Sequence, residues 1–367
     1  MKTILIAHNY TENSFAFMSY YLAHYLASLG NKVIFISHKP FFEKPFRENI
    51  EKGELLVYSW PTQNRPVKLS DAVWFAKIYL KYKPSVIISH FVSVNITIII
   101  SKLLSLGKVK TYPYYHTLSS QILGDSKKTA FRINLEKYRK RLLYHFFADA
   151  IICPSDLANE DLKKYFDLKN GIKVLNPLKD RFYKKNEISP NLIVISYLGR
   201  LEPSKGVLDL IKAFVKYKRK FTDSKIILNI AGTGSQQEKI QSLIDNNPGI
   251  IYHGGLSYDK IDTYLNESHF TVISSKFDNL PTVGLESMMN QTPLLISNTT
   301  GLSSELEEGL ECFKFNSTIE EMVLLFERVE NNFDKQQEMG INARKTFLKK
   351  FGIYTYCQTI EKLVENV

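Results

Sequence analysis

The chain has 367 residues, of which 44% are hydrophobic, and it carries a formal net charge of +11. This length exceeds what one hydrophobic core usually supports, so we expect two domains, and the apolar content excludes an intrinsically disordered protein. The three cysteines, Cys153, Cys312 and Cys357, form no CxxC pair. Their spacing argues against a zinc site or a disulfide framework and predicts small buried residues.

The N-terminus has only a short apolar run, residues 1–7, before His8. That run is too brief for the hydrophobic region of a signal peptide, so we expect a cytoplasmic protein. The most apolar window, Val86 to Leu106, is interrupted by His90, Asn95 and Lys102 and falls short of a membrane span. It predicts a buried strand followed by a buried helix.

The first half alternates short apolar runs with helical patterns. A strand over 3–7 precedes an amphipathic helix that ends before Gly30, and a second strand follows over 33–37. Further strands are predicted over 55–58, 86–89, 109–114 and 149–153. Such alternation is typical of a doubly wound α/β domain with parallel, right-handed connections.

The positive charge belongs to the first half. Residues 1–185 contain 29 lysines and arginines against 14 aspartates and glutamates, whereas residues 186–367 contain 19 against 23. The densest part, 127–141, has seven cations and one anion, with Phe131, Leu135, Tyr138 and Leu142 at helical spacing. It predicts either a basic amphipathic helix that lies on anionic lipid or a core-facing helix with a solvated cationic face.

A polar, proline-flanked stretch over 176–191 marks the expected domain boundary. We therefore predict a first domain over 1–180, a second over 190–345, and a C-terminal helical region over 346–367 that packs back on the first. The second domain repeats the architecture, with strands over 192–198 and 226–231 and a helix from Val207. Ser235 and Thr318 each begin a predicted capping box.

Two cations follow the first strand of the second domain, in Gly199-Arg200 and in Lys205-Gly206. An arginine binds phosphate oxygens through its planar fork, and a lysine does so as a point charge. Because both lie just past a strand end, we expect them to neutralise the diphosphate of a nucleotide-activated substrate.

Two carboxylates follow a later apolar strand over 270–273. Asp278 lies in a loop, and we expect it to contact a sugar hydroxyl; the alternative is an Asx turn that caps the next helix. Pro281 predicts a helix start, which leaves backbone amides for a phosphate, and Glu286 one turn later is placed to bind a ribose diol. The amides belong to Thr282, Val283 and Gly284.

These motifs together resemble the retaining glycosyltransferases of family 4, also described as glycosyl transferases group 1. The resemblance covers residues 192–305 and depends on Gly199-Arg200, Lys205-Gly206, Gly232-Thr233-Gly234, the strand pair around His253-Gly254-Gly255, and the acid-x7-acid segment ending at Glu286. It implies a GT-B fold, an α/β architecture of two facing Rossmann-like domains with a cleft between them. In this family the first acid is usually Glu; here it is Asp278, which puts the sugar specificity in question.

The resemblance also implies roles for individual residues. Arg200 and Lys205 would hold the diphosphate, Asp278 the transferred sugar and Glu286 the ribose, with Gly199, Gly232 and Gly234 in the donor-binding loops. A histidine near the donor sugar is common in the family at a place like His116. No cofactor and no metal are implied, since the nucleotide sugar is a co-substrate.

Two histidines follow strands of the first domain, His90 and His116, and strand ends are where ligands bind in such sheets. A lone histidine is also often a hydrogen-bonded structural residue, so both readings stay open. The first strand is followed by Asn9, Tyr10 and Asn13, candidates for acceptor contacts, but the glycine pair of many relatives is missing. The acceptor is therefore left open.

We expect a cytoplasmic retaining glycosyltransferase that moves a hexose to a saccharide acceptor, lipid-linked and used for surface polysaccharide or glycan. Contact with the inner face of an anionic membrane would explain the charge distribution. Two alternatives remain: a sugar-nucleotide epimerase of the same fold, and a catalytically silent partner subunit. Nucleic-acid binding is disfavoured, because no compact motif reads base edges.

Overall fold

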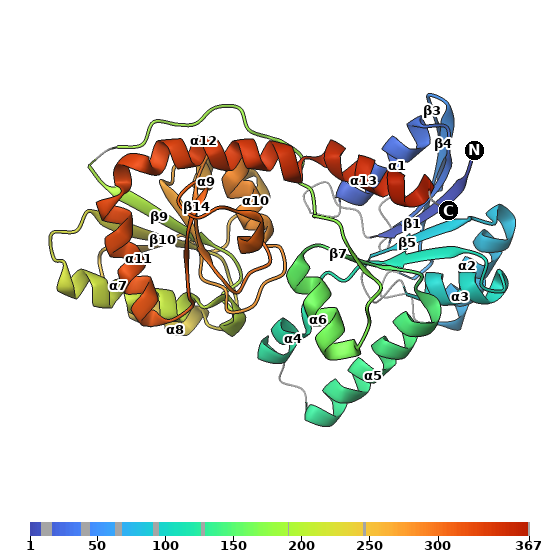
Figure 1. The fold of residues 1–367 in the computed structure, drawn as a ribbon, viewed down its shortest axis with the longest axis horizontal. Coiled ribbons are helices and arrows are strands. Elements are labelled where there is room, and N and C mark those ends of the chain that lie inside the picture. The colour runs from blue at the N-terminus through green and yellow to red at the C-terminus, as the bar shows by residue number, and fades with distance from the viewer. Residues whose placement is uncertain are drawn as a thin grey trace. The chain divides into compact units, whose positions relative to one another are not determined.

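The computed structural model describes residues 1–8, 17–37, 45–62, 68–90, 95–125, 129–189, 191–244 and 247–365. The chain divides into two compact units, which we call the N-terminal and C-terminal units (Figure 1). The N-terminal unit comprises 1–116, 128–177 and 353–367, and the C-terminal unit comprises 117–127 and 178–352. No helix among the described residues is long and apolar enough to cross a membrane.

The N-terminal unit contains a six-stranded sheet in the order β3-β4-β2-β1-β5-β6. All neighbours are parallel except β3 and β4, which form an antiparallel hairpin. The strands are β1 (Thr3–His8), β2 (Lys32–Ser37), β3 (Phe46–Ile50), β4 (Gly53–Ser59), β5 (Val86–Ser89) and β6 (Lys110–Pro113). The sequence did not predict β3, because none of its five residues is buried and its three middle residues are polar, unlike the buried apolar run of a central strand.

Helices cover both faces of this sheet because successive strand residues point to opposite sides. Ile4 and Ile6 pack in the cluster that contains α1 (Phe17–Ser28) and α13 (Ile353–Glu365). Leu5 and Ala7 pack in a second cluster with α2 (Leu69–Tyr82). The remaining elements are α3 (Ile96–Leu104), α5 (Ala130–Phe147), β7 (Ile151–Cys153), α6 (Asp156–Phe166) and β8 (Gly171–Lys173).

The end of the chain is shared between the units. Residues 346–352 belong to the C-terminal unit and α13 to the N-terminal unit. Within the latter, the Tyr356 and Tyr114 hydroxyls lie 2.5 Å apart, and the Tyr25 hydroxyl donates to Glu361 at 2.5 Å. These buried or half-buried contacts tie α13 to α1 and to the end of β6.

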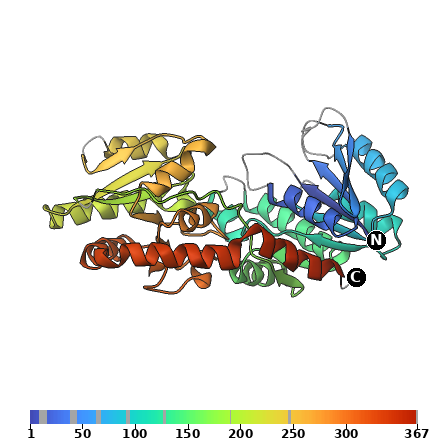
Figure 2. The same ribbon diagram turned by 90° about the horizontal axis from the view of Figure 1, so that it is seen from above.

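The C-terminal unit has a fully parallel sheet in the order β11-β10-β9-β12-β13-β14. Its strands are β9 (Ile193–Leu198), β10 (Ile226–Ala231), β11 (Ile250–Tyr252), β12 (Phe270–Ile273), β13 (Leu294–Ser297) and β14 (Cys312–Phe315). Helices lie on both sides of it (Figure 2). They are α7 (Val207–Lys220), α8 (Gln237–Ile244), α9 (Tyr258–Asn266), α10 (Thr282–Met289), α11 (Ile319–Asn331) and α12 (Gln336–Thr346). Each unit is thus a Rossmann-like doubly wound α/β structure, as predicted.

The two predicted helix caps, Thr318 and Ser235, differ in the structure. Thr318 caps α11 by accepting from the Glu321 amide at 3.3 Å, which is half of the predicted capping box, and its own amide donates to the Asn316 carbonyl at 2.7 Å. Ser235 instead donates its hydroxyl to Glu202 at 2.6 Å, and α8 begins two residues later. The carboxylate of Glu202 thus binds the side chain that was expected to cap the helix.

Two predictions about burial have different outcomes. The three cysteines are free and buried, as expected. In the apolar window, β5 is fully buried, but the predicted buried helix α3 has exposed Leu103 and Leu104 at its end. That helix covers the sheet with one face only.

Candidate functional site

Both sheets have a topological switch point, where the chain order of the strands reverses. In the C-terminal unit it lies between β9 and β12, and in the N-terminal unit between β1 and β5. Ligands of open α/β sheets bind at the carboxyl ends of the strands at such points. Gly199 and Arg200 follow β9, and the loop that contains Asp278 follows β12. His8 ends β1 and His90 follows β5.

Two glycines allow the loops of the C-terminal switch point to approach closely. Gly232 has a φ of 139°, and a Cβ there would lie 1.8 Å from the carbonyl oxygen of Gly199. Gly206 has a φ of 69°, and its Cβ would lie 2.2 Å from the carbonyl oxygen of Ser274. Any side chain at either position would both strain the backbone and push the loops apart.

Backbone hydrogen bonds hold these loops in register. The Leu201 amide donates to the Thr233 carbonyl at 2.9 Å, and the Lys276 amide donates to the Ser204 carbonyl at 2.7 Å. The loops after β9, β10 and β12 therefore form one hydrogen-bonded surface.

Lys205 and Asp278 form an ion pair at this surface. Lys205 is the last residue of the 3-10 turn η2 (Pro203–Lys205). The side chains of Lys205 and Asp278 are only 16% and 11% exposed. Ser275 also donates to the Asp278 carboxylate, at 3.3 Å. The Asp278 carboxylate is therefore held in place by the Lys205 ammonium and the Ser275 hydroxyl. The structure thus brings two of the predicted site residues together.

Arg200 has a partner that the sequence did not indicate. Its guanidinium lies 3.7 Å from the carboxylate of Asp125, at the end of α4 (Ser119–Asp125), a segment of the C-terminal unit. Asp125 also accepts from the Ser204 amide at 3.1 Å and from the Ser204 hydroxyl at 2.8 Å. The Asp125 carboxylate therefore already accepts a hydrogen bond from the first backbone amide of η2, that of Ser204, and lies beside Arg200. Nothing in the sequence joins residues 125 and 204.

The helix start after Pro281 is where it was predicted, since α10 begins at Thr282 with Pro281 before it. One of the three amides expected to be unused is not: Gly284 donates to the Pro281 carbonyl at 3.0 Å. The first turn closes as a 3-10 bond, which uses that donor. Thr282 and Val283 stay the candidates for a phosphate contact.

Glu286 is buried in α10 and is 6% exposed. Burial raises the pKa of its carboxyl to about 7, and Arg181 opposes the shift, with its guanidinium 3.6 Å away. Arg181 binds Asp262 through two hydrogen bonds of 2.8 and 2.9 Å. Asn290 donates to the same carboxylate at 3.0 Å. Glu286 therefore sits beside a fixed cation that is largely neutralised by Asp262.

A stack of aromatic rings occupies the switch point of the N-terminal unit. The rings of His8 and His90 are parallel, with centroids 4.0 Å apart. The ring of Tyr114 also stacks on that of His90, and their centroids are likewise 4.0 Å apart. Nδ1 of His90 lies 3.1 Å from Nε2 of His116, which joins the two predicted histidines by a hydrogen bond. His8, which the sequence did not indicate, hydrogen-bonds the Ser19 hydroxyl through Nδ1.

The imidazoles of His90 and His116 are neutral at physiological pH, because the pKa of each is lowered. Burial lowers the pKa of His116 to about 3, with a further contribution from Lys140. Burial, together with His8 and His116, holds the pKa of His90 well below its usual range. A neutral imidazole both donates and accepts one hydrogen bond, so the pair has the properties needed to bind a hydroxyl. The acceptor candidates Asn9, Tyr10 and Asn13 lie outside the described residues.

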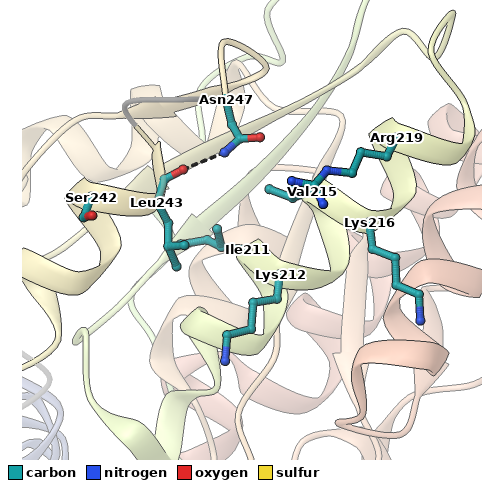
Figure 3. A pocket seen from close by; sticks show the side chains of 8 residues that line it. All are labelled: Ile211, Lys212, Val215, Lys216, Arg219, Ser242, Leu243 and Asn247. Atoms are coloured by element: carbon teal, nitrogen blue, oxygen red, sulfur yellow. Dashed lines mark hydrogen bonds between the residues drawn. The ribbon is translucent and has the colours of Figure 1, made fainter.

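A separate hollow of about 540 Å³ lies over α7 and α8 (Figure 3). It is lined by Ile211, Lys212, Val215, Lys216, Arg219, Ser242, Leu243 and Asn247. Asn247 donates to the Leu243 carbonyl at 2.7 Å, which fixes one rim. None of the predicted donor residues lines this hollow, so it is a different surface from the strand-end site.

Two family models match consecutive parts of the chain. The model described as Glycosyltransferase Family 4 matches residues 17–177, and Glycosyl transferases group 1 matches residues 179–346. The two matches meet at residues 177–179, which is also where the chain passes from the N-terminal to the C-terminal unit.

Curated relatives include an uncharacterized glycosyltransferase of Methanocaldococcus jannaschii, 24% identical over 70% of this chain and 66% of the relative. The capsular polysaccharide biosynthesis glycosyltransferase CapM of Staphylococcus aureus is 23% identical over 51% of this chain and 49% of its own. The chain thus spans about two thirds of the first relative and about half of the second.

Two solved structures resemble the whole chain. Sucrose-phosphate synthase of Thermosynechococcus elongatus has a TM-score of 0.76 at 13% identity, over 100% of this chain and 99% of the other. HepE of Anabaena, in complex with UDP, has a TM-score of 0.74 at 13% identity, over 100% of both chains. At this identity the likeness shows the fold alone, and it confirms the predicted GT-B fold.

Proposed function

Because the chain belongs to the glycosyltransferases with the GT-B fold, we propose that it transfers a hexose from a nucleotide sugar to a saccharide acceptor with retention at the anomeric carbon. The observation that carries the proposal is the Lys205–Asp278 pair at the C-terminal switch point. A cation for the leaving diphosphate and a carboxylate for the sugar are there held side by side. Arg200 follows the neighbouring strand end of the same surface.

In the proposed reaction, Arg200 and Lys205 bind the diphosphate and stabilise the charge that develops as it leaves. The acceptor hydroxyl attacks the anomeric carbon on the face from which the diphosphate departs. The bond from that carbon to the phosphate oxygen breaks, and the hydroxyl proton passes to the leaving diphosphate. Two fixed cations supply the positive charge that a metal would otherwise provide, so we expect no metal requirement and no other cofactor.

The remaining groups orient the donor. Glu286 accepts hydrogen bonds from the ribose diol, and Asp278 accepts from a hydroxyl of the transferred sugar. The amides of Thr282 and Val283 at the start of α10 are suited to a phosphate oxygen. We further propose that the neutral His116, oriented by His90, contacts a sugar hydroxyl. Most of the rate enhancement then comes from positioning and electrostatics.

We propose that the acceptor is lipid-linked and serves surface polysaccharide or glycan synthesis at the cytoplasmic face of a membrane. One support is the relative CapM, which is described as a capsular polysaccharide biosynthesis glycosyltransferase. The other is the positive charge of the first half of this chain. The HepE complex makes UDP the first nucleotide to test.

Calorimetric titration with UDP, GDP and ADP tests the donor site directly. We expect one nucleotide to bind to the wild-type chain and to bind far more weakly to the Arg200→Ala variant. Arg219→Ala is the matched control, since that arginine lines the separate hollow. Equal binding by wild type and Arg200→Ala would overturn the proposed donor site.

Product analysis then separates transfer from epimerisation. With the nucleotide sugar that binds, we expect release of the nucleoside diphosphate only when a saccharide acceptor is present. Turnover of the donor alone to an isomer, with no acceptor, would overturn the proposal in favour of an epimerase. Activity that persists in excess EDTA is the expected result for the metal-independent reaction.

A further inference from the structure

The helix α5 has an apolar stripe that faces away from its own unit. Phe131, Tyr138 and Phe146 are 79%, 60% and 67% exposed, and Leu135 and Leu142 are also exposed. At about 100° per residue, these five positions fall within roughly 80° of arc on one side of the helix. The stripe is therefore continuous along all of α5.

The opposite side of α5 is the one that packs. Lys140 lies over the rings of Tyr115, at 4.2 Å, and of Phe166, at 5.3 Å, and Tyr144 is buried. Lys137 lies over the ring of Tyr165 at 4.6 Å. The unit thus anchors the helix through lysine stems and a tyrosine. One of the two predictions for this segment was a helix that packs its apolar face, Phe131, Leu135, Tyr138 and Leu142, in the core. That prediction is wrong, because all four side chains are exposed.

Arginines flank the exposed stripe. Arg132 and Arg139 lie on one side of it and Arg141 on the other, by the same helical geometry. Arg132 lies 3.8 Å from Glu136 and Arg141 lies 3.1 Å from Asp167, and both pairs are exposed. Surface pairs of this kind are weak and leave the arginines able to engage a new anion.

We propose that this face of α5, which we call the α5 stripe face, docks on an anionic lipid bilayer. Aromatic and leucine side chains enter the boundary between headgroups and acyl chains, while the flanking arginines contact lipid phosphates. A second copy of the chain is a poor occupant, because two such faces would bring like charges together. The inference deepens the proposed function, since it rests in part on a lipid-linked acceptor.

The hollow over α7 and α8 is a useful contrast. It also carries Lys212, Lys216 and Arg219 (Figure 3). None of its apolar lining residues is exposed, since Ile211 is fully buried and Val215 and Leu243 are partly buried. A flat bilayer does not reach recessed groups. Cations without projecting apolar side chains bind anionic lipid only by charge, which salt screens.

Sedimentation with vesicles tests the proposal without donor or acceptor, so its failure leaves the transfer reaction untouched. The probes are phosphatidylcholine vesicles with and without 30 mol% phosphatidylglycerol, a composition of about one anionic lipid in three. We expect the wild-type chain to sediment with the anionic vesicles at least about tenfold more strongly than with the neutral ones. No preference for the anionic vesicles would overturn the proposal.

Matched variants locate the surface. Phe131→Ser with Phe146→Ser should lower the partition coefficient at least about tenfold, because two exposed rings no longer enter the bilayer. The control is Leu324→Ser, an exposed leucine of α11 in the other unit, for which no change is expected. Equal losses in both would overturn the assignment to α5.

Charge variants complete the test. Arg132→Glu with Arg139→Glu should lower the partition coefficient by more than tenfold, whereas Lys212→Glu with Lys216→Glu, which removes two exposed lysines of α7, should have a much smaller effect. The reverse ranking would assign docking to the hollow and overturn the proposal. Circular dichroism of each variant verifies that it is folded.

A spectroscopic variant reports insertion directly. In Tyr138→Trp, the emission added to that of the two native tryptophans should shift to the blue with anionic vesicles and be quenched by brominated acyl chains. Leu324→Trp should show neither effect. Velocity sedimentation distinguishes the other occupant: a dimer that Phe131→Ser dissociates, without any vesicle binding, would overturn the proposal in favour of a second copy.

Discussion

At the switch point of the C-terminal unit the strands are followed by charged residues in pairs, whereas at that of the N-terminal unit they lead into stacked imidazoles. Lys205 binds Asp278 and Arg200 lies beside Asp125, while His8, His90 and Tyr114 stack on one another. The same fold therefore presents charge at one strand edge and neutral hydrogen-bonding groups at the other. A diphosphate requires the first and a sugar hydroxyl is satisfied by the second.

The two strand edges also differ in how their stability should depend on pH. Burial raises the pKa of Glu286 to about 7 and lowers that of His116 to about 3, so each group is pushed toward its neutral form. The stability contributed by Glu286 is therefore lost as the pH rises, whereas that contributed by His116 is lost as the pH falls. Charged pairs, neutral stacks and these opposite shifts provide separate ways to test the contrast.

The largest expected effect is on turnover, from Arg200→Ala. Its guanidinium is proposed to stabilise charge on the departing diphosphate, and the loss of such a group typically costs about 100- to 1,000-fold in rate. The side chain is 59% exposed, so the melting temperature should hardly change. Steady-state kinetics and thermal unfolding measure the two effects. Parallel losses of rate and melting temperature would show a structural role.

Lys205→Ala should lower both activity and stability. Removal of the ammonium leaves the Asp278 carboxylate largely buried without its cation, at a cost of about 3 kcal/mol in the free energy of unfolding. Adding Asp278→Asn removes the stranded charge. We expect the double variant to regain most of the stability and none of the activity, as measured by denaturant unfolding and kinetics. A double variant as unstable as the single one would contradict this account.

Glu286 should make the C-terminal unit less stable as the pH rises. The folded pKa, about 7, lies above the ordinary value of 4.5, so the contribution is full below pH 4.5 and is lost between pH 4.5 and about 7. At pH 8 the difference from Glu286→Gln should approach 3 kcal/mol. Denaturant unfolding of both proteins across this range measures it. Parallel pH profiles for wild type and variant would contradict the predicted shift.

Nucleotide binding sharpens this prediction. Ribose hydroxyls donate to the ionised carboxylate, so bound nucleotide should lower the pKa of Glu286 and release a proton near pH 6 to 7. Calorimetry in two buffers of different ionisation enthalpy detects that proton. The Glu286→Gln variant should release none.

The sequence predicted the parts of this contrast that depend on local pattern. Strand ends followed by Gly199-Arg200, and a proline before the helix with Glu286, are local signals, and the structure places both at strand and helix ends as expected. The parallel sheets follow from alternating apolar strands and helices. Family resemblance supplied the roles of the charged residues, which remain proposals.

The partners could not be predicted, because they come from distant parts of the chain. Asp125 reaches Ser204 across 79 residues and Arg181 reaches Asp262 across 81. His8 did have a usable signal, since it ends the first strand at the switch point, but its stacking on His90 depends on strand order. The orientation of α5 was equally open, because both of its sides carry apolar side chains.

The smallest expected effect is acid lability of the N-terminal unit. Since the pKa of His116 is depressed to about 3, its contribution is full above the ordinary value of 6.5 and is lost as the pH falls below it. At pH 5 the loss from this residue is about 2 kcal/mol. His90, whose pKa is also depressed, adds to the loss in the same direction.

His90→Phe isolates the second contribution, because a phenyl ring keeps the stacking on His8 and Tyr114 but takes up no proton. We expect the variant to lose less stability than the wild type between pH 7 and pH 5 in thermal unfolding. Exposed His145→Asn is the control and should follow the wild type. An unchanged acid profile in His90→Phe would mean that the stack is not buried and neutral in solution, and the contrast between the two strand edges would then rest on the charged side alone.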